Sequence, residues 1–303
     1  MIRRIRSYLG THLAIFILWL LSYLPYPFVA RLGENLGSLA FLFPSKRKRV
    51  VLTNLQVCFP EWTPTQRLNI ARQTFRYVVR SFAERGMLWF GSAQRICKWV
   101  HVDDQAGLGK FTALPSIMLG MHLVGIEAGA LRLTLYLNEI GVKNGLTTLY
   151  TPMKNRRFDA FVKRARERFS GRMLLRSDRA LTLLRLIRQG TAVQLSPDMD
   201  FGHNDSEFVD FFNVPACTLT VVSRLARLTG AKIIPVVTDL LPAYQGYVLR
   251  ILPAWENYPG EDIHTDTRRM NAFFESRIVA DPAQYYWVHR RFKTRPADMP
   301  PLY

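Results

Sequence analysis

The sequence predicts an α/β fold, with a mixed central sheet covered by helices and an N-terminal hydrophobic membrane anchor. Two observations indicate the sheet and its helices. Short apolar runs alternate with amphipathic ones from residue 115 onward, and nearly half of the 303 residues are apolar, which suffices for a sizeable core. The third observation, an apolar run near the N-terminus with basic residues on both sides, indicates the anchor.

The anchor is expected from the apolar run at residues 13–30. As a helix it would reach roughly 25 Å, short of the ~30 Å hydrocarbon core of a bilayer, and Pro25 and Pro27 shorten it further. A cleaved signal peptide is disfavoured because no small-x-small cleavage site follows the run. The run therefore fits either a single spanning helix or a segment that lies in one leaflet.

The charges around this run predict its orientation. Three arginines precede it, and five basic residues follow it, namely Arg31 and the cluster at 46–49. By the positive-inside rule, the body of the protein stays on the cytoplasmic side. Because no repeat or long linker follows, we expect residues 1–45 to form the anchor and its basic flank, and residues 46–303 to form one α/β domain.

Regular elements are expected along this domain. Thr63 can cap a helix over residues 63–87, in which Pro64 occupies the first turn and apolar residues recur at helical spacing. The strand-like runs are 116–121, 146–150, 192–196, 232–238 and 247–252. The helical runs between and after them are 158–169, 179–188, 218–228 and 266–279.

Composition limits the class of partner. The 41 Lys and Arg against 23 Asp and Glu give a net charge of +18, which favours an anionic partner. Nucleic acid, an anionic membrane, a phosphorylated substrate and an acidic carrier protein all fit. The three cysteines are far apart and have neither a disulfide framework nor zinc-type spacing. We expect no metal and no cofactor.

His122 and Glu127, in the run MHLVGIE, are the candidate catalytic pair. Five residues along a helix leave two side chains ~140° apart, so the pair would not meet on one helical face. They can meet if His122 ends a strand and Glu127 lies in the first turns of the next helix, a corner that Gly120 and Gly125 allow. The spacing fits a core histidine bonded to a carboxylate equally well.

Such a corner could perform acid–base chemistry. A carboxylate on one imidazole nitrogen would fix the tautomer and leave the other nitrogen free as a base. The start of the helix would also leave free backbone N–H groups beside His122, where an oxyanion could bind.

Three further residues are candidates for the site. Asp198 and Asp200, in SPDMDFG, follow the strand-like run 192–196, and sites of α/β proteins commonly form at such strand ends. A solvated acidic loop is the alternative. Arg166, in the basic run KRARER, is either a substrate contact or part of a charged helix face.

The stretch at residues 284–296, QYYWVHRRFKTRP, mixes aromatic and basic residues. Single-stranded nucleic acid or a lipid headgroup region would suit this mixture equally well.

Seven segments taken together resemble a known family, the late acyltransferases of bacterial lipid A biosynthesis. These are the lauroyl/myristoyl-type enzymes of the lysophospholipid acyltransferase superfamily. The resemblance covers nearly the whole chain. The segments are NLQVCFPEW, MHLVGIE, PMKN, PDMDFG, FVDFFNVPA, LARLTGAKIIPV and QYYWVHRRFKTRP.

The resemblance implies residues and a reaction. It places the catalytic pair on His122 and Glu127, and further functional residues on Arg166 and Asp198. The reaction implied is transfer of a fatty acyl chain, lauroyl or myristoyl, from acyl carrier protein to a hydroxyl of a phosphorylated lipid A precursor. His122 would act as the general base, assisted by Glu127.

The resemblance also implies a location, the inner membrane, with the catalytic domain on the cytoplasmic face. It implies no nucleic-acid partner. The alternatives are acylation of a glycerophospholipid or another glycolipid by the same chemistry, and a membrane-tethered nucleic-acid-binding protein.

Overall fold

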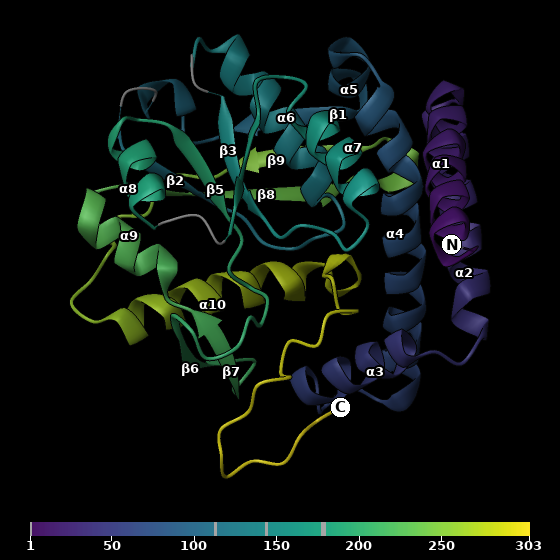
Figure 1. Cartoon of the computed structure of the whole chain (residues 1–303). Coiled ribbons are helices and arrows are strands. Elements are labelled where there is room, and N and C mark those ends of the chain that lie inside the picture. The colour runs from purple at the N-terminus through teal and green to yellow at the C-terminus, as the bar shows by residue number, and fades with distance from the viewer. Residues whose placement is uncertain (1, 112–113, 143–144, 177–179) are drawn as a thin grey trace.

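A computed structural model describes residues 2–111, 114–142, 145–176 and 180–303, and within them the predicted α/β class is confirmed (Figure 1). Seven strands form the central sheet in the order β1-β9-β8-β2-β5-β3-β4. All neighbours in it are parallel except β8 and β9, so the sheet is mostly parallel. Its strands are β1 Val100–Asp104, β2 Ser116–Leu119, β3 Leu146–Tyr150, β4 Arg172–Leu175, β5 Ala192–Leu195, β8 Lys232–Leu240 and β9 Tyr247–Ile251. A separate hairpin joins β6 Ser206–Phe211 to β7 Val214–Leu219.

Helices cover the sheet and extend beyond it on the N-terminal side. They are α1 Ile2–Tyr23, α2 Tyr26–Leu42, α3 Lys46–Cys58, α4 Pro64–Phe90, α5 Ala93–Trp99, α6 Ile126–Glu139, α7 Arg156–Arg166, α8 Ala180–Arg188, α9 Val221–Thr229 and α10 Ile263–Ala280. Figure 1 shows α1 and α2 beside α4 at one edge of the molecule, with α10 across the lower side of the sheet.

Most expected elements are present. The five strand-like runs correspond to β2, β3, β5, β8 and β9, and three of the expected helices are α4, α7 and α10. Thr63 caps α4 in a capping box with Gln66, as its position predicted. The run expected to be helical from residue 218 begins as a helix only at Val221, because Thr218 and Leu219 end strand β7. The expected start of the run at 179–188 lies outside the described residues.

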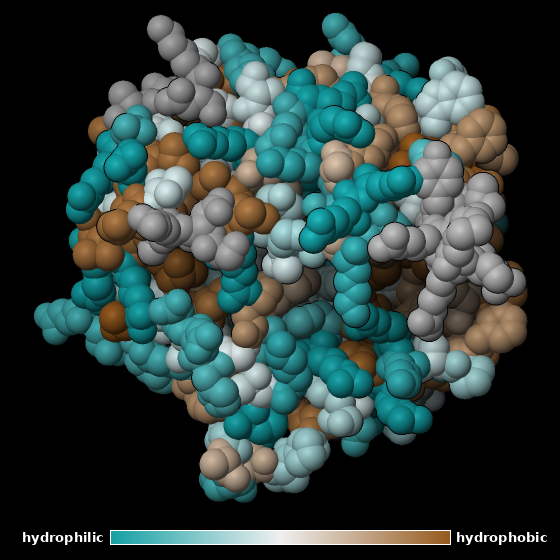
Figure 2. Space-filling model, in the orientation of Figure 1, coloured by the Kyte–Doolittle hydropathy of each residue, from teal (hydrophilic) through white to brown (hydrophobic). Residues whose placement is uncertain are grey.

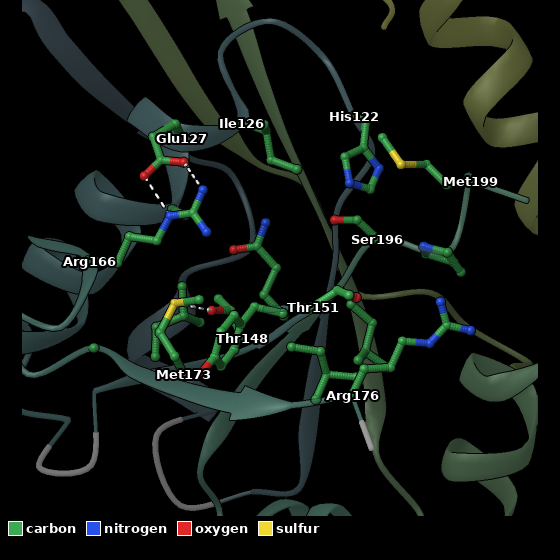
Figure 3. A pocket seen from close by; sticks show the side chains of 18 of the residues that line it. His122, Ile126, Glu127, Thr148, Thr151, Arg166, Met173, Arg176, Ser196 and Met199 are labelled. Atoms are coloured by element: carbon green, nitrogen blue, oxygen red, sulfur yellow. Dashed lines mark hydrogen bonds and ion pairs between the residues drawn. The ribbon is translucent and has the colours of Figure 1, made fainter. Parts of the chain in front are cut away.

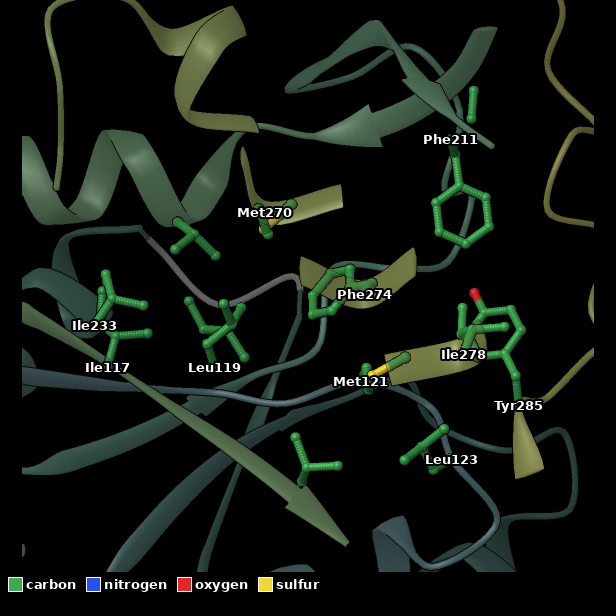
Figure 4. Close-up of a cluster of buried hydrophobic side chains, with 14 of the residues drawn as sticks. Ile117, Leu119, Met121, Leu123, Phe211, Ile233, Met270, Phe274, Ile278 and Tyr285 are labelled. Carbon is green, nitrogen blue, oxygen red and sulfur yellow. The ribbon is translucent and has the colours of Figure 1, made fainter. Parts of the chain in front are cut away.

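The core follows from the alternation of side chains along buried strands. Ile117, Leu119 and Ile233 face α10, where Met270 and Phe274 pack against them (Figure 4). The residues that alternate with these along the strands point to the opposite face of the sheet. There Met118, Ile234 and Val236 pack with Leu133 and Leu137 of α6. A sheet covered on both faces explains why these strands read as continuous apolar runs.

The N-terminal helices pack closely on α4. Gly33 and Gly37 of α2 meet its backbone, and an added Cβ at either glycine would lie 2.5 Å from backbone atoms of Arg80 or Phe75. Glu34 of α2 is buried and accepts hydrogen bonds from Arg76 and Arg80 of α4. The small residues of α2 therefore fix its distance to α4.

No helix in the described part of the chain is both long enough and apolar enough to span a membrane. The apolar run expected as an anchor divides between α1 and α2, which are separated at Leu24 and Pro25.

The contact between α2 and α4 can be tested with one methyl group. We expect Gly37→Ala to destabilise the protein by roughly 1–3 kcal/mol, because the helix backbones must separate to accept the Cβ. The matched control is Gly10→Ala on α1, where nothing lies within 4 Å of the added Cβ, and which should be neutral or slightly stabilising. Thermal unfolding measures both, and equal midpoints would contradict the close packing.

Candidate active site

The position of His122 follows from the corner between β2 and α6. Strand β2 ends at Leu119, and α6 begins at Ile126 with Glu127 in its first turn, as the sequence predicted. Both glycines of the corner are needed because of close neighbours. An added Cβ at Gly120 would lie 2.8 Å from Gln194 Nε2, and one at Gly125 would lie 2.8 Å from the side chains of Thr238 and Tyr247.

Asp198 is the residue that holds His122. Its carboxylate is completely buried, and its Oδ1 lies 2.7 Å from His122 Nδ1. Its Oδ2 accepts the backbone N–H of the same residue at 2.9 Å. Burial alone would raise the pKa of this carboxyl, but His122 and its hydrogen bonds lower that pKa below its usual value. A carboxylate at Nδ1 requires the proton there and leaves Nε2 as the free base.

The expected contact between Glu127 and His122 is wrong. Glu127 binds Arg166 through both carboxylate oxygens, at 2.8 Å to Nε and 2.5 Å to Nη2. The indole N–H of Trp89 donates to the same carboxylate at 2.8 Å. Figure 3 shows this ion pair on one side of a cavity and His122 on the other, with Ile126 between them. The first turn of α6 directs Glu127 toward α7 and away from the imidazole.

Glu127 is ionised by its surroundings. Burial alone would raise its pKa, but the Arg166 guanidinium, with further contributions from Arg85 and Trp89, brings the pKa of Glu127 down to about 2. Arg166 is therefore neutralised within the protein, which makes it a poor candidate for a direct substrate contact.

Asp200 supports the loop that carries Asp198. It is buried, and its carboxylate accepts hydrogen bonds from the backbone and hydroxyl of Thr294 and from the Gly202 N–H. Its own backbone N–H donates to His289 Nε2. Asp198 and Asp200 are 0% and 1% exposed, so neither is a solvated acidic loop residue, and neither lines the cavity.

The C-terminal aromatic and basic stretch offers little surface to nucleic acid or lipid headgroups, because six of its thirteen residues are buried and two, Arg290 and Lys293, are exposed. Trp287 and Phe292 are fully buried, and Arg291 is 1% exposed while it donates to Thr218. The Tyr286 N–H binds the carbonyl of His122, and the Tyr285 hydroxyl binds that of Asp198. This stretch therefore holds both halves of the histidine–aspartate pair in place.

The sequence also predicted that backbone N–H groups beside His122 are free to bind an oxyanion, and this is wrong for three of them. The N–H groups of His122, Leu123 and Val124 already donate, to Asp198, Met121 and Gln284 respectively. None of these three is available to an oxyanion.

A cavity of about 500 Å³ lies in front of His122. Ile126, Ala130 and Thr134 recur along one face of α6 and line it with Leu146 and Met173 from the neighbouring strands. Figure 3 shows Met173 and Thr148 in the part of the cavity beyond the ion pair. The cavity is therefore titratable beside His122, Glu127 and Arg166. The part lined by Ile126, Ala130, Thr134, Leu146 and Met173 is mainly apolar and is called the apolar arm. It follows α6 for about 12 Å, by the helical rise from residue 126 to residue 134.

Several residues of the site were not predicted from the sequence. Arg85 of α4 and Ser196 after β5 line the cavity, and the Ser196 hydroxyl points toward the His122 ring in Figure 3. Trp89 of α4 does not line the cavity but binds Glu127 behind its wall. Arg85 and Trp89 lie one turn apart on a helix that reads as amphipathic, so no local signal distinguished them from its solvated face. Among the described residues, no three side chains gather as metal ligands.

Comparison with known proteins gives matches along nearly the whole chain. The profile of the bacterial lipid A biosynthesis acyltransferases matches residues 2–294. The lipid A biosynthesis lauroyltransferase of Escherichia coli (strain K12) is 36% identical over 296 residues, which cover 97% of this chain and 94% of that protein. The palmitoleoyltransferase of the same strain is 31% identical over 95% of this chain and 92% of its own. The lipid A biosynthesis myristoyltransferase of that strain is 30% identical over 91% of this chain and 83% of its own.

The low pKa of Glu127 predicts how stability depends on pH. A carboxyl with a folded pKa of about 2 and an unfolded pKa near ~4.3 contributes stability above pH ~4.3 and loses it as the pH falls toward 2. We expect Glu127→Gln to lower the melting temperature at pH 7, because Arg166 loses its counterion. The gap to the wild type should narrow below pH ~5.

The control for this series is Glu261→Gln, which removes the carboxylate of an exposed residue. Its melting temperature should follow the wild type at every pH. A Glu127→Gln gap that stayed constant from pH 7 to pH 3 would contradict the assignment.

Proposed function

Because the chain belongs to the bacterial lipid A biosynthesis acyltransferase family, we propose that it moves a lauroyl or myristoyl chain from acyl carrier protein to a hydroxyl of a lipid A precursor. Family membership makes the protein an O-acyltransferase of lipid A biosynthesis. The donor, the chain length and the residues that act are the further content of the proposal.

The observation that carries the mechanism is the buried Asp198 carboxylate on His122 Nδ1. Among the described residues, Nε2 of the same ring has no hydrogen-bond partner, and the residue lines the cavity. The acceptor hydroxyl gives its proton to Nε2 as its oxygen attacks the thioester carbonyl carbon. Collapse of the tetrahedral intermediate breaks the C–S bond, and the imidazolium returns the proton to the leaving thiolate. Asp198 stabilises the imidazolium during both steps.

Glu127 acts at a distance from the imidazole. It fixes Arg166 and the first turn of α6, and so shapes the wall of the cavity opposite His122. We assign it a positioning role in place of direct assistance to the base.

The apolar arm of the cavity is the proposed site of the acyl chain. Its walls at Ile126, Ala130 and Leu146 offer no charge, and an acyl chain gains favourable free energy by leaving water there. Residues 1–45 are the proposed membrane-attachment part, and residues 46–303 the acyltransferase domain. The helix faces of α1 and α2 expose apolar side chains, among them Phe16, Leu39 and Leu42.

This attachment would place the cavity near its lipid substrate at the inner membrane. Hydrophobic side chains reach the surface at the edge where α1 and α2 lie, and others lie at the opposite edge, with hydrophilic side chains between them (Figure 2). The basic cluster Lys46–Arg49 begins α3, directly after these helices. Apolar side chains beside basic ones favour an interface with anionic lipids, and the net charge of +18 favours an acidic carrier protein. The apolar and basic surface and the net positive charge both support a location on the cytoplasmic face of the membrane.

The mechanism predicts the cost of removing each member of the pair. With lauroyl or myristoyl carrier protein and a phosphorylated lipid A precursor, we expect His122→Ala to abolish transfer. Asp198→Asn should lower kcat by roughly a hundredfold or more, because the amide no longer selects the Nδ1–H tautomer. Mass spectrometry of the lipid product measures both. The control is Asp210→Asn, an exposed aspartate on β6, which should keep full activity. Full activity in His122→Ala would contradict the proposed function.

The apolar arm predicts a change of chain length. Ala130 lines the arm from α6, so Ala130→Leu should shorten the space and shift preference toward shorter acyl donors. A competition between lauroyl and myristoyl carrier proteins measures the ratio of products, and roughly a tenfold change is expected for one or two excluded methylenes. Ala280→Leu, at the exposed end of α10, is the matched control. An unchanged ratio in Ala130→Leu would exclude this arm as the acyl site.

A further inference from the structure

Arg85 of α4 is a cation in the cavity that makes no ion pair with the described residues. It lines the cavity and is largely removed from solvent. Its Nε is buried, and among the described residues it has no hydrogen-bond partner. The guanidinium carbon lies 3.9 Å from the centroid of the Phe82 ring and 5.7 Å from that of Trp89, so its contacts are with aromatic faces. Such stacking fixes the plane of a guanidinium without neutralising its charge.

The other arginines that line the cavity are either paired with a carboxylate or exposed to water, and Arg85 is neither. Arg166 has both of its paired nitrogens on Glu127. Arg172 and Arg176 are exposed, and water can solvate them. Of the described residues that line the cavity, four thus carry a guanidinium group and one, Glu127, a carboxylate. This surplus of positive charge favours an anionic ligand, and Arg85 is the member of the set whose hydrogen-bonding groups a ligand would complete.

The location of Arg85 shows which part of a substrate it could meet. Burial lowers the pKa of its guanidinium, while the nearby Glu127 opposes that shift and Arg166 adds to it. The residue one turn further along α4, Trp89, binds the Glu127 carboxylate. Arg85 therefore belongs to the wall formed by Glu127 and Arg166, and His122 lies on the other side of the cavity (Figure 3). A group held there is not the carbonyl at which the reaction occurs.

We infer that Arg85 binds a phosphate ester group of a substrate and so orients that substrate toward His122. The planar fork of a guanidinium matches two phosphate oxygens, which an ammonium group does not. The inference rests on the proposed function, in which two phosphate esters can reach this cavity. One belongs to the phosphorylated glycolipid acceptor, and the other to the phosphopantetheine arm that carries the acyl chain on its carrier protein.

The test is a set of kinetic constants for Arg85→Met. We expect KM for the phosphorylated substrate to rise roughly tenfold to a hundredfold, with kcat changed by less than about twofold, since one charge-assisted contact is lost in ground and transition state alike. Arg85→Lys should be intermediate. The control is Arg72→Met, an exposed arginine on the same helix, with kinetic constants within about twofold of the wild type.

Substrates without phosphate identify the source. If the acceptor phosphate is the ligand, the KM effect of Arg85→Met disappears with a dephosphorylated acceptor. If the donor phosphate is the ligand, the effect disappears with an acyl thioester of N-acetylcysteamine. An effect that persists with both substrates, an effect on kcat alone, or unchanged constants would each overturn the inference.

Stability distinguishes a ligand-binding arginine from a structural one. Removal of a charge that is largely desolvated and makes no ion pair with the described residues should leave the melting temperature of Arg85→Met equal to or above that of the wild type. A lower melting temperature with unchanged KM would assign Arg85 a structural role and overturn the inference.

Binding of inorganic phosphate separates this inference from the proposed function. At constant ionic strength, phosphate should raise the melting temperature of the wild type and of Arg72→Met more than that of Arg85→Met. If that difference is observed while the wild type transfers no acyl chain, the proposed function fails and the phosphate site stands. Equal shifts in all three proteins, with acyl transfer intact, would overturn the phosphate site alone.

Discussion

The site depends on one buried anion, the Asp198 carboxylate. A carboxylate without access to water is unfavourable unless hydrogen bonds compensate for the lost hydration. Asp198 receives two, from the backbone and the ring of His122, so the group that stabilises the anion is also the group it orients. Because the ring supplies the contact at Oδ1, it cannot rotate without leaving that buried oxygen unpaired. The tautomer needed for catalysis is thereby part of the stability of the fold.

The surroundings of this pair explain the position of the C-terminal stretch. Strands β2 and β5 are parallel neighbours, which brings His122 and Asp198 to the same edge of the sheet. The loop after β5 is held by Thr294 through Asp200, and the corner after β2 is held by Tyr286 through the carbonyl of His122. A segment close to the C-terminus thus connects the two strand ends that form the site. On the opposite wall the Glu127–Arg166 pair limits the cavity, and Arg85 lies near it with no ion pair of its own to the described residues.

The sequence predicted those parts of the site that local patterns determine. An apolar strand, a glycine and a following helix placed His122 at a strand end and Glu127 in the first helical turn, and the capping residues of α4 were equally readable. The partners were not readable, because they depend on contacts between distant residues. Asp198 is 76 residues from His122, and Arg166 is 39 residues from Glu127. Two carboxylates and two cationic partners were present, and only the order of strands in the sheet decides which pairs form. Aromatic and basic composition likewise could not show that Tyr285, Trp287 and Arg291 are buried, since burial depends on packing between segments that are distant in the sequence.

The most direct test of the central claim is the protonation state of the His122 ring, measured by nitrogen NMR on protein labelled with ¹⁵N-histidine. The resonances are assigned by comparison with His122→Ala. We expect the wild type to show a proton on Nδ1 and none on Nε2, with the Nδ1 proton in a hydrogen bond that Asp198→Asn weakens. A proton on Nε2 in the wild type, or a ring unaffected by Asp198→Asn, would contradict the account of Asp198 as the group that prepares His122 to act as a base.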